Sequence, residues 1–429
     1  MKNNEFINKV KLTGNPFFIK DILVMYLKKE LFFNKKLKNV NFLGIKEEPK
    51  ENINAIIDII SKDDDIFIDN NSKDIYYKTR SIGCSYCTMG KGVTIVLSYK
   101  CHRDCFFCYE ETPLKPKIHI DPYAKNDMDN IYKIIDTGFS NTSNKTFAIT
   151  GGEPFLFTDK VYEVLEYVNN KYPDKHTRIY TTGDIMNEDK LIKLKKLKLN
   201  EIRYSIKPGE KPKLEIYALT KKYIPTVIIE MPVFPKTKKY MIDILTEINE
   251  DGNIDGINLN ELTFNNLNYE KYKEKGYKLD LPINKFDIYH RYYDVPKIEI
   301  GVYGSKILCL ELINYFSKTD SNFFMHYCDL DTVSTHHYLY KKAHAESIKR
   351  DYSKITNYGL HKILRIYSKL DKVLDILVKN NLDNYFNNGN FIETNVSYLD
   401  LFENKGFIII IVYKNFDYKY DIDFKIINM

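Results

Sequence analysis

The stretch Val93-Thr-Ile-Val-Leu97-Ser-Tyr-Lys-Cys101-His-Arg-Asp-Cys105-Phe-Phe-Cys108 decides how the rest of the chain is interpreted. It begins with a short apolar run, which is typical of a buried parallel strand. Three cysteines follow this run, and the last lies seven positions after the first. One short loop at the end of a strand can therefore bring three thiolates together.

Three clustered thiolates favour a particular class of metal. Soft sulfur ligands select iron–sulfur clusters, zinc or copper(I). A cubane 4Fe–4S cluster takes four ligands, so three cysteines leave one iron open. An open metal position is what a catalytic site needs and what a structural site avoids. The loop therefore predicts a catalytic metal centre.

Further strands follow the cysteine loop at regular intervals, with helical patterns between them. Because strands that alternate with helices form βαβ units, the pattern predicts an α/β fold with a parallel sheet. Six strands between about residues 92 and 264 predict a partial or full β/α barrel. The expected strands after the first are 146–150, 178–180, 201–206, 226–231 and 256–260. One of the expected helices covers 127–136, with Gly138 as its C-cap.

Polar and glycine-rich segments stand at the ends of these strands. They are the cysteine loop, Gly151-Gly152-Glu153-Pro154, Thr181–Asp184 and Asn260-Glu261. In barrels of this kind the chemistry sits at the carboxyl ends of the strands. The shared placement predicts one active site.

The flanks of the barrel have different patterns, and three parts are expected. Residues 1–91 form an N-terminal segment that carries a CxxC pair, and residues 92–294 form the barrel. Residues 295–429 are expected to form a small α+β module. Within that module we expect a helix over 360–378, a loop over 384–390 and late strands over 407–413 and 418–426.

The spacing Cys101-x3-Cys105-x2-Cys108 after a first strand, with Phe107 before the third cysteine, resembles the radical SAM superfamily. The turn from Gly151 to Pro154, at the end of the second strand, is also similar to that family. The resemblance covers roughly residues 92–265. It implies a partial (β/α)6 barrel of radical SAM type.

The resemblance also implies the chemistry. The triad would hold three irons of a 4Fe–4S cluster, and S-adenosylmethionine (SAM) would chelate the fourth. Reductive cleavage of SAM would give a 5′-deoxyadenosyl radical that takes a hydrogen atom from an unknown substrate, which could be a protein or peptide, an RNA or a metabolite. An electron donor such as ferredoxin or flavodoxin is implied.

The resemblance further implies cofactor-binding residues. Gly151, Gly152 and Glu153 would meet the methionyl group of SAM. The backbone at Phe107 would read the adenine, and Ser205 would reach the ribose. The catalytic residues that act on the substrate are not indicated by any motif.

Four cysteines remain outside the triad, namely Cys84, Cys87, Cys309 and Cys328. A CxxC pair such as Cys84 and Cys87 is half of a tetrahedral site. The four could hold an auxiliary iron–sulfur cluster or a zinc ion. Two alternatives stay open: a CxxC pair with Cys328 and one non-cysteine or open position, and a Cys309 that is only a core thiol.

Composition bears on whether the protein binds nucleic acid or membranes and on its compartment. The 64 basic residues nearly balance the 58 acidic ones, so a net charge of +6 does not indicate nucleic-acid binding. The longest apolar run, 407–413, is too short to span a bilayer, so no membrane partner is expected. Seven cysteines and no signal peptide favour the cytoplasm.

A competing hypothesis is a non-enzymatic binding protein that is stabilised by zinc or a cluster. In that case the triad would bind zinc with His102 or Cys84 as the fourth ligand, and the C-terminal module would carry the binding surface. The Gly151–Pro154 turn at a strand end speaks against this hypothesis.

Overall fold

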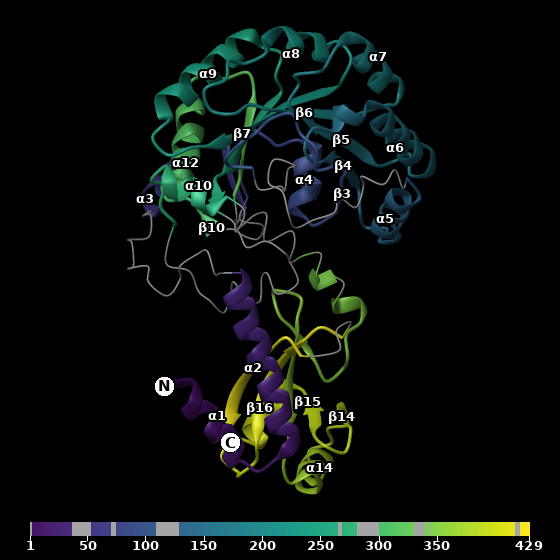
Figure 1. Ribbon diagram of the computed structural model, residues 1–429, viewed down its shortest axis with the longest axis vertical. Coiled ribbons are helices and arrows are strands. Elements are labelled where there is room, and N and C mark those ends of the chain that lie inside the picture. Colours follow the sequence, from purple (N-terminus) through teal and green to yellow (C-terminus); the bar gives the residue numbers. More distant parts are fainter. Residues whose placement is uncertain are drawn as a thin grey trace. The chain divides into compact units, whose positions relative to one another are not determined.

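The computed structural model describes residues 2–36, 53–69, 74–108, 128–264, 268–280, 300–329, 339, 341–343, 345–416 and 421–429. The chain forms two compact units. One unit consists of residues 44–282 and 299–336, and the other of residues 1–43, 283–298 and 337–429. Figure 1 shows the elements of both units along the sequence.

A nine-stranded sheet is the centre of the first unit, in the order β1-β2-β11-β8-β7-β6-β5-β4-β3. Neighbouring strands from β3 to β8 pair in parallel, and β11 extends the parallel part beyond β8. The parallel strands are β3 (Gly92–Val96), β4 (Thr146–Thr150), β5 (His176–Thr181), β6 (Glu201–Ser205), β7 (Thr226–Val233), β8 (Gly256–Glu261) and β11 (Phe324–Cys328). The predicted six-stranded barrel of α/β class is therefore confirmed as a partial barrel, with β11 as one more parallel strand.

An antiparallel hairpin closes one edge of this sheet. Its strands are β1 (Ile66–Asp69) and β2 (Asp74–Tyr77), and β2 pairs antiparallel with β11. Because of this pairing, part of the expected N-terminal segment belongs to the barrel sheet. A small two-stranded sheet, β9 (Thr263–Phe264) and β10 (Ile300–Gly301), follows β8.

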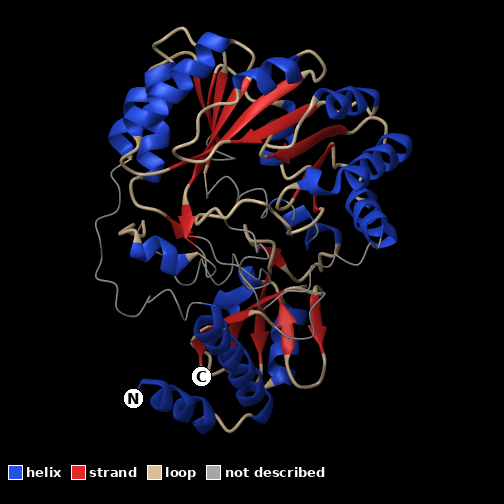
Figure 2. Cartoon of the chain, turned by 45° about the horizontal axis from the view of Figure 1, so that its top comes forward, coloured by secondary structure: helices blue, strands red, loops and turns tan. Residues whose placement is uncertain are grey.

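Helices cover the outer side of the sheet, as Figures 1 and 2 show. They are α3 (Asn54–Ile60), α5 (Met128–Ser140), α6 (Thr158–Lys171), α7 (Glu188–Lys196), α8 (Leu214–Lys221), α9 (Lys238–Asp251) and α12 (Ser305–Phe316), with the short turn η1 (Pro154–Phe157) before α6. The helices pack on the sheet through an apolar stripe. In α6 this stripe consists of Val161, Val164, Leu165 and Val168, which are all fully buried. The short helix α10 (Tyr269–Glu274) lies instead beside the cysteine loop, where Tyr272 packs against Phe106. Helix α4 (Ile82–Thr88) lies instead inside the arc of strands (Figure 1).

The second unit packs two N-terminal helices on an antiparallel sheet. Helix α1 (Lys2–Leu12) contributes Val10, and α2 (Pro16–Lys36) contributes Phe18 and Ile22, to a core that they share with Ile363 and Val412 of the sheet. The sheet order is β14-β15-β13-β16-β17, with β12 paired to β13. The elements are β12 (Lys354–Ile355), β13 (His361–Ile366), α14 (Leu370–Lys379), β14 (Tyr385–Asn387), β15 (Ile392–Thr394), η2 (Val396–Leu401), β16 (Ile409–Lys414) and β17 (Asp423–Asn428).

Three local predictions were wrong. The helix expected over 360–378 is strand β13 followed by α14, because a buried apolar run cannot be told from a helix by its periodicity. The loop expected over 384–390 contains strand β14, which pairs with β15. Gly138 lies within α5 rather than after it, and a Cβ there would collide with Val93.

The two units divide the chain differently from the three parts expected from sequence. Residues 53–91 join the barrel through the hairpin and α4, whereas α2 contacts β17 of the C-terminal sheet. No helix in the described part of the chain is both long and apolar enough to cross a bilayer.

Candidate functional site

A cavity of about 440 Å³ opens at the carboxyl ends of the parallel strands. Every strand from β3 to β8, together with β11 and α4, contributes a residue to its lining. The strand residues are Thr94, Thr150, Tyr180, Thr181, Arg203, Ser205, Glu230, Pro232, Asn260, Glu261, His326 and Cys328. The cavity therefore lies where the ends of the strands were expected to gather chemistry.

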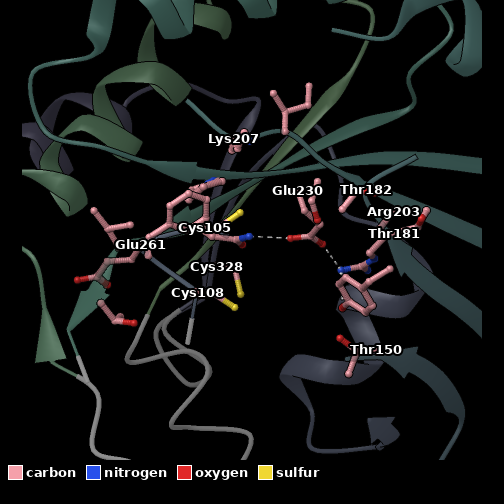
Figure 3. A pocket seen from close by; sticks show the side chains of 18 of the residues that line it. Cys105, Cys108, Thr150, Thr181, Thr182, Arg203, Lys207, Glu230, Glu261 and Cys328 are labelled. Carbon is pink, nitrogen blue, oxygen red and sulfur yellow. Dashed lines mark hydrogen bonds and ion pairs between the residues drawn. The ribbon is translucent and has the colours of Figure 1, made fainter. Parts of the chain in front are cut away.

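The cysteine loop forms part of the cavity wall. Cys101, Cys105 and Cys108 all line the cavity, and Figure 3 shows the sulfurs of Cys105 and Cys108 beside it. A turn in which the Cys108 N–H donates to the Cys105 carbonyl at 3.0 Å brings the last two cysteines close. The structure thus brings the three triad residues to one wall.

The glycine-rich turn is bonded to the segment just before the cysteines. Gly152 N–H donates to the Ser98 carbonyl, and Glu153 N–H donates to the Lys100 carbonyl, both at 2.8 Å. A Cβ on Gly151 would collide with the Ser98 backbone, and one on Gly152 with the Lys100 backbone. Gly151 also has a φ of 138°, which favours glycine. Both glycines are needed for this close approach, and both line the cavity.

An ion-pair cluster fixes the other side of the cysteine loop. Arg103 is 9% exposed and binds Asp184 through both Nε and Nη2 at 2.6 Å. His102 and Lys213 reach the same carboxylate at 2.6 Å, and Arg103 also binds Glu210 at 3.1 Å. Partial burial alone would raise the pKa of Asp184, but these hydrogen bonds and cations hold it far below its usual range.

Glu153 contacts protein groups rather than the cavity. It is fully buried, and its carboxylate accepts hydrogen bonds from Thr181 Oγ1 and from both N–H and Oγ1 of Thr182, each at 2.7 Å. It also accepts from the Phe155 N–H at 3.1 Å. The carboxylate therefore ties the ends of β4 and β5 together, and its direct contact with a cofactor stays a prediction.

The other residues expected to bind a cofactor do line the cavity. Ser205 lies at the end of β6, next to the barrel interior. Phe107 packs edge-on against Phe106 and Phe234, with ring centroids 5.5 and 5.2 Å apart. Asn260 and Glu261, at the end of β8, are part of the same wall.

A polar network that was not expected from sequence forms the floor of the cavity. Glu230 Oε1 accepts from Arg203 Nη1 and Asn258 Nδ2, both at 2.7 Å, and Oε2 accepts from Asn260 Nδ2 at 2.9 Å. Figure 3 shows the contact between Glu230 and Arg203. Arg203 also binds Glu201 at 2.5 Å. The signal was present, because Glu230 is a charge within the apolar run 227–231.

The second cysteine group is only partly assembled here. Cys84 and Cys87 of α4 and Cys328 of β11 line the same cavity, and Figure 3 shows the sulfur of Cys328 facing it. Cys309 is fully buried on α12 in the apolar core and is not part of the cavity wall. The four-cysteine site therefore stays a prediction, with three of its members in one place.

The thiols respond to burial and to their neighbours. Burial raises the pKa of Cys101, and burial with the nearby Cys108 thiol raises that of Cys105 to about 11. Burial, then Glu230 and the thiols of Cys84 and Cys87, raise the pKa of Cys328. Cys105 is thus influenced by Cys108, and Cys328 by Cys84 and Cys87.

The pKa of Cys84 moves in the opposite direction to those of Cys101, Cys105 and Cys328. Burial alone would raise its pKa, but Arg203 and then His326 outweigh that effect and lower it to about 7. Arg203 Nη2 lies 3.2 Å from the sulfur. Among the described residues, no three Cys, His, Asp or Glu side chains already converge on one point as a single metal ion would need.

Comparisons with known proteins agree with this geometry. Residues 95–230 match the family model described as the Radical SAM superfamily. A protein of Methanocaldococcus jannaschii, provisionally described as a glycyl-radical enzyme activating enzyme, is 25% identical over 292 residues. The match covers 65% of this chain and 71% of that protein.

Two solved structures are also similar. Streptococcus suis SuiB is 13% identical with a TM-score of 0.37, and the match covers 72% of this chain and 61% of that one. BtrN in complex with AdoMet and 2-DOIA is 20% identical with a TM-score of 0.25, covering 33% and 56%. The chain thus spans less than two thirds of the length of either structure.

Proposed function

The chain belongs to the radical SAM superfamily, and on that premise we propose that its cavity is where a 4Fe–4S cluster and SAM are held for hydrogen-atom abstraction. The observation that carries the proposal is that three thiols of one loop and the glycine turn line a single cavity. Soft thiolates are the ligands that iron–sulfur clusters take, so the donor set fits the group.

Cys101, Cys105 and Cys108 would each hold one iron. When bound, the cluster and SAM supply a 5′-deoxyadenosyl radical that takes a hydrogen atom from the substrate. The protein's own contribution is position. Backbone hydrogen bonds fix the segment Ser98–Lys100 before the cysteines to the glycine turn. The ion pair of Arg103 with Asp184 fixes the loop on its other side.

Gly151, Gly152, Phe107 and Ser205 are proposed to bind SAM, because each lines the cavity next to the cysteine loop. Glu153 is proposed to act through the strand ends, since its carboxylate is occupied by Thr181 and Thr182. Glu153 would thereby hold the glycine turn beside the cysteine loop without contacting SAM itself.

The floor of the cavity is proposed to face the substrate. Glu230, Arg203 and Asn260 form a hydrogen-bonded set there, so a substrate with polar groups could be oriented by them. The Methanocaldococcus protein is described as activating a glycyl-radical enzyme, which makes a polypeptide glycine the first substrate to test.

Radical SAM enzymes need an electron donor, and we expect ferredoxin or flavodoxin to serve here. Seven cysteines with no disulfide among them suit the reducing cytoplasm as the place of work. The match to the radical SAM family over residues 95–230 favours the enzyme over the metal-stabilised binding protein.

SAM cleavage tests the proposal. Protein purified without oxygen is reduced with dithionite, and 5′-deoxyadenosine is measured against time. We expect turnover in the natural protein and a loss of at least 100-fold in Cys105→Ala. Cys309→Ala makes the same chemical change in the core and should keep the activity. Cleavage that survives in Cys105→Ala would refute the assignment.

A further inference from the structure

The cavity that the triad lines also holds a second set of side chains of metal-binding type. Cys84 and Cys87 lie one turn apart on α4, so they share one face of that helix. His326 and Cys328 lie two positions apart on β11, so they share one face of that strand. All four line the cavity.

His326 has the arrangement that metal-binding histidines have. It is 2% exposed, and its Nε2 lies 2.6 Å from Asp74 Oδ1 on the neighbouring strand β2. Asp74 is itself fully buried and is paired with Arg80. A carboxylate at Nε2 fixes that nitrogen as the N–H donor and leaves the lone pair on Nδ1.

The other ring nitrogen, Nδ1, is buried, and the imidazole acts on the Cys84 thiol, whose pKa it lowers. His326 and Cys84 are therefore neighbours although they come from β11 and α4. A metal centre ligated by Nδ1 and by the Cys84 thiolate would use both groups. Asp74 would be the outer partner that orients the ring.

The surroundings of Cys84 suit a thiolate ligand. Arg203 Nη2 lies 3.2 Å from its sulfur, and Asn258 Nδ2 lies 3.5 Å from it. Donors of this kind commonly stabilise sulfur ligands in metal centres. Cys309 offers no such position, since it is fully buried among apolar side chains of α12.

We propose that Cys84, Cys87, Cys328 and His326 form a second metal site, in which His326 takes the place expected for a fourth cysteine. Three thiolates and one imidazole suit an iron–sulfur cluster, whose irons lie apart and do not require the four side chains to converge on one point. With four protein ligands the centre is closed, so it joins α4 to β11 rather than binding substrate. It goes beyond the proposed function, because it does not depend on SAM chemistry.

The test removes the triad first, so that the two sites are read separately. A Cys101→Ala, Cys105→Ala, Cys108→Ala variant is purified without oxygen, and its iron, zinc and acid-labile sulfide are measured. We expect metal to remain in this variant. Iron with acid-labile sulfide supports the proposal, whereas zinc without sulfide overturns the assignment of a cluster. Absence of metal above trace level overturns it.

Further changes in the same background identify the ligands. His326→Ala should lower the bound metal at least fivefold and lower the thermal midpoint. His326→Cys should restore the metal, because it returns a ligand to the same place, and this separates ligation from folding. Cys309→Ala is the matched control and should keep the metal. Full metal in His326→Ala, or its loss in Cys309→Ala alone, would overturn the ligand set.

The outcome also separates this site from the proposed function. If the triad variant keeps its metal while the natural protein fails to cleave SAM, the second site stands and the radical chemistry fails. If the natural protein cleaves SAM and the triad variant holds no metal, the reverse conclusion follows.

Discussion

Two glycines join the cysteine loop to the neighbouring strand end. Gly151 and Gly152 line the cavity, and each lies so close to the Ser98–Lys100 backbone that a side chain has no room. The two glycines therefore allow the segment just before the three thiols to lie against the end of β4.

Replacing Gly152 with alanine is expected to push the loop away from β4. Overpacking of this kind costs about 1–3 kcal/mol of unfolding free energy, and iron content should fall with it. Gly92→Ala is a control at the start of β3, where the added carbon would lie 3.3 Å from the Thr146 methyl rather than in collision with backbone. Equal iron content in Gly152→Ala and Gly92→Ala would contradict the expectation.

His176 gives the barrel a dependence on pH. Burial is the main reason that its pKa lies below the ordinary value of 6.5, although Glu201 pulls the pKa upward. The folded state therefore binds its proton less readily than the unfolded state does. Stability that is present above about pH 6.5 is lost as the pH falls below that value.

The expected result is a thermal midpoint that falls more steeply between pH 7 and pH 5 in the natural protein than in His176→Asn. The variant lacks the titrating ring, so the difference between the two curves reports this group. Parallel curves across the interval would show that His176 has the same pKa in both states.

At the scale of elements, the cysteine loop depends on the loop after β5. Arg103 and Asp184 form two hydrogen bonds of 2.6 Å, and charge-assisted bonds of this geometry are among the strongest in proteins. The clamp lies between two loops and contributes nothing to the sheet.

Asp184→Asn should therefore leave the barrel folded and release the cysteine loop. We expect the iron–sulfur absorbance to bleach several-fold faster in air than in the natural protein. Asp255→Asn, which breaks the ion pair with Lys221 elsewhere on the barrel, is the matched control. If both variants bleach at the natural rate, the clamp does not hold the loop.

The order of the barrel elements could be predicted from sequence, because each parallel strand is a short apolar run bounded by helical patterns. The run 146–150 is buried at four of its five positions, as a strand covered on both faces must be. The same reasoning failed at 360–378, since strand β13 is buried as a helix would be. Antiparallel pairing with β16 decides that case, and pairing cannot be seen in one segment.

The candidate site was predictable where its residues are close in sequence and not where they come from separate elements. The spacing of Cys101, Cys105 and Cys108 is enough to predict that they act together. Arg203 and Glu230 meet only because β6 and β7 are neighbours in the sheet. The role of His326 could not be predicted either, because its partner Asp74 lies on β2 and comes close only through the pairing of β2 with β11.

At the scale of the whole molecule, the division into two units has a consequence for stability. Phe18 of α2 is fully buried in the core that holds Ile363 and Val412, so the N-terminal helices stabilise the C-terminal sheet. The barrel has its own continuous core, which does not include these residues.

Phe18→Ala should accordingly destabilise one unit and spare the other. Removing a buried phenylalanine costs about 3–5 kcal/mol. Hydrogen exchange read by mass spectrometry should show faster exchange in β13 and β16 and unchanged exchange in β4 to β7. Leu12→Ala is the control, because that side chain is 85% exposed. Equal acceleration in both units would mean that they unfold together.

The account rests on one claim, that the triad loop holds a cluster with an open iron. An electron paramagnetic resonance spectrum of protein purified and reduced without oxygen, recorded before and after SAM is added, tests it most directly. The account predicts a reduced 4Fe–4S signal that changes when SAM is added and that is missing in Cys105→Ala. Zinc without iron, or a cluster signal that SAM leaves unchanged, would contradict it.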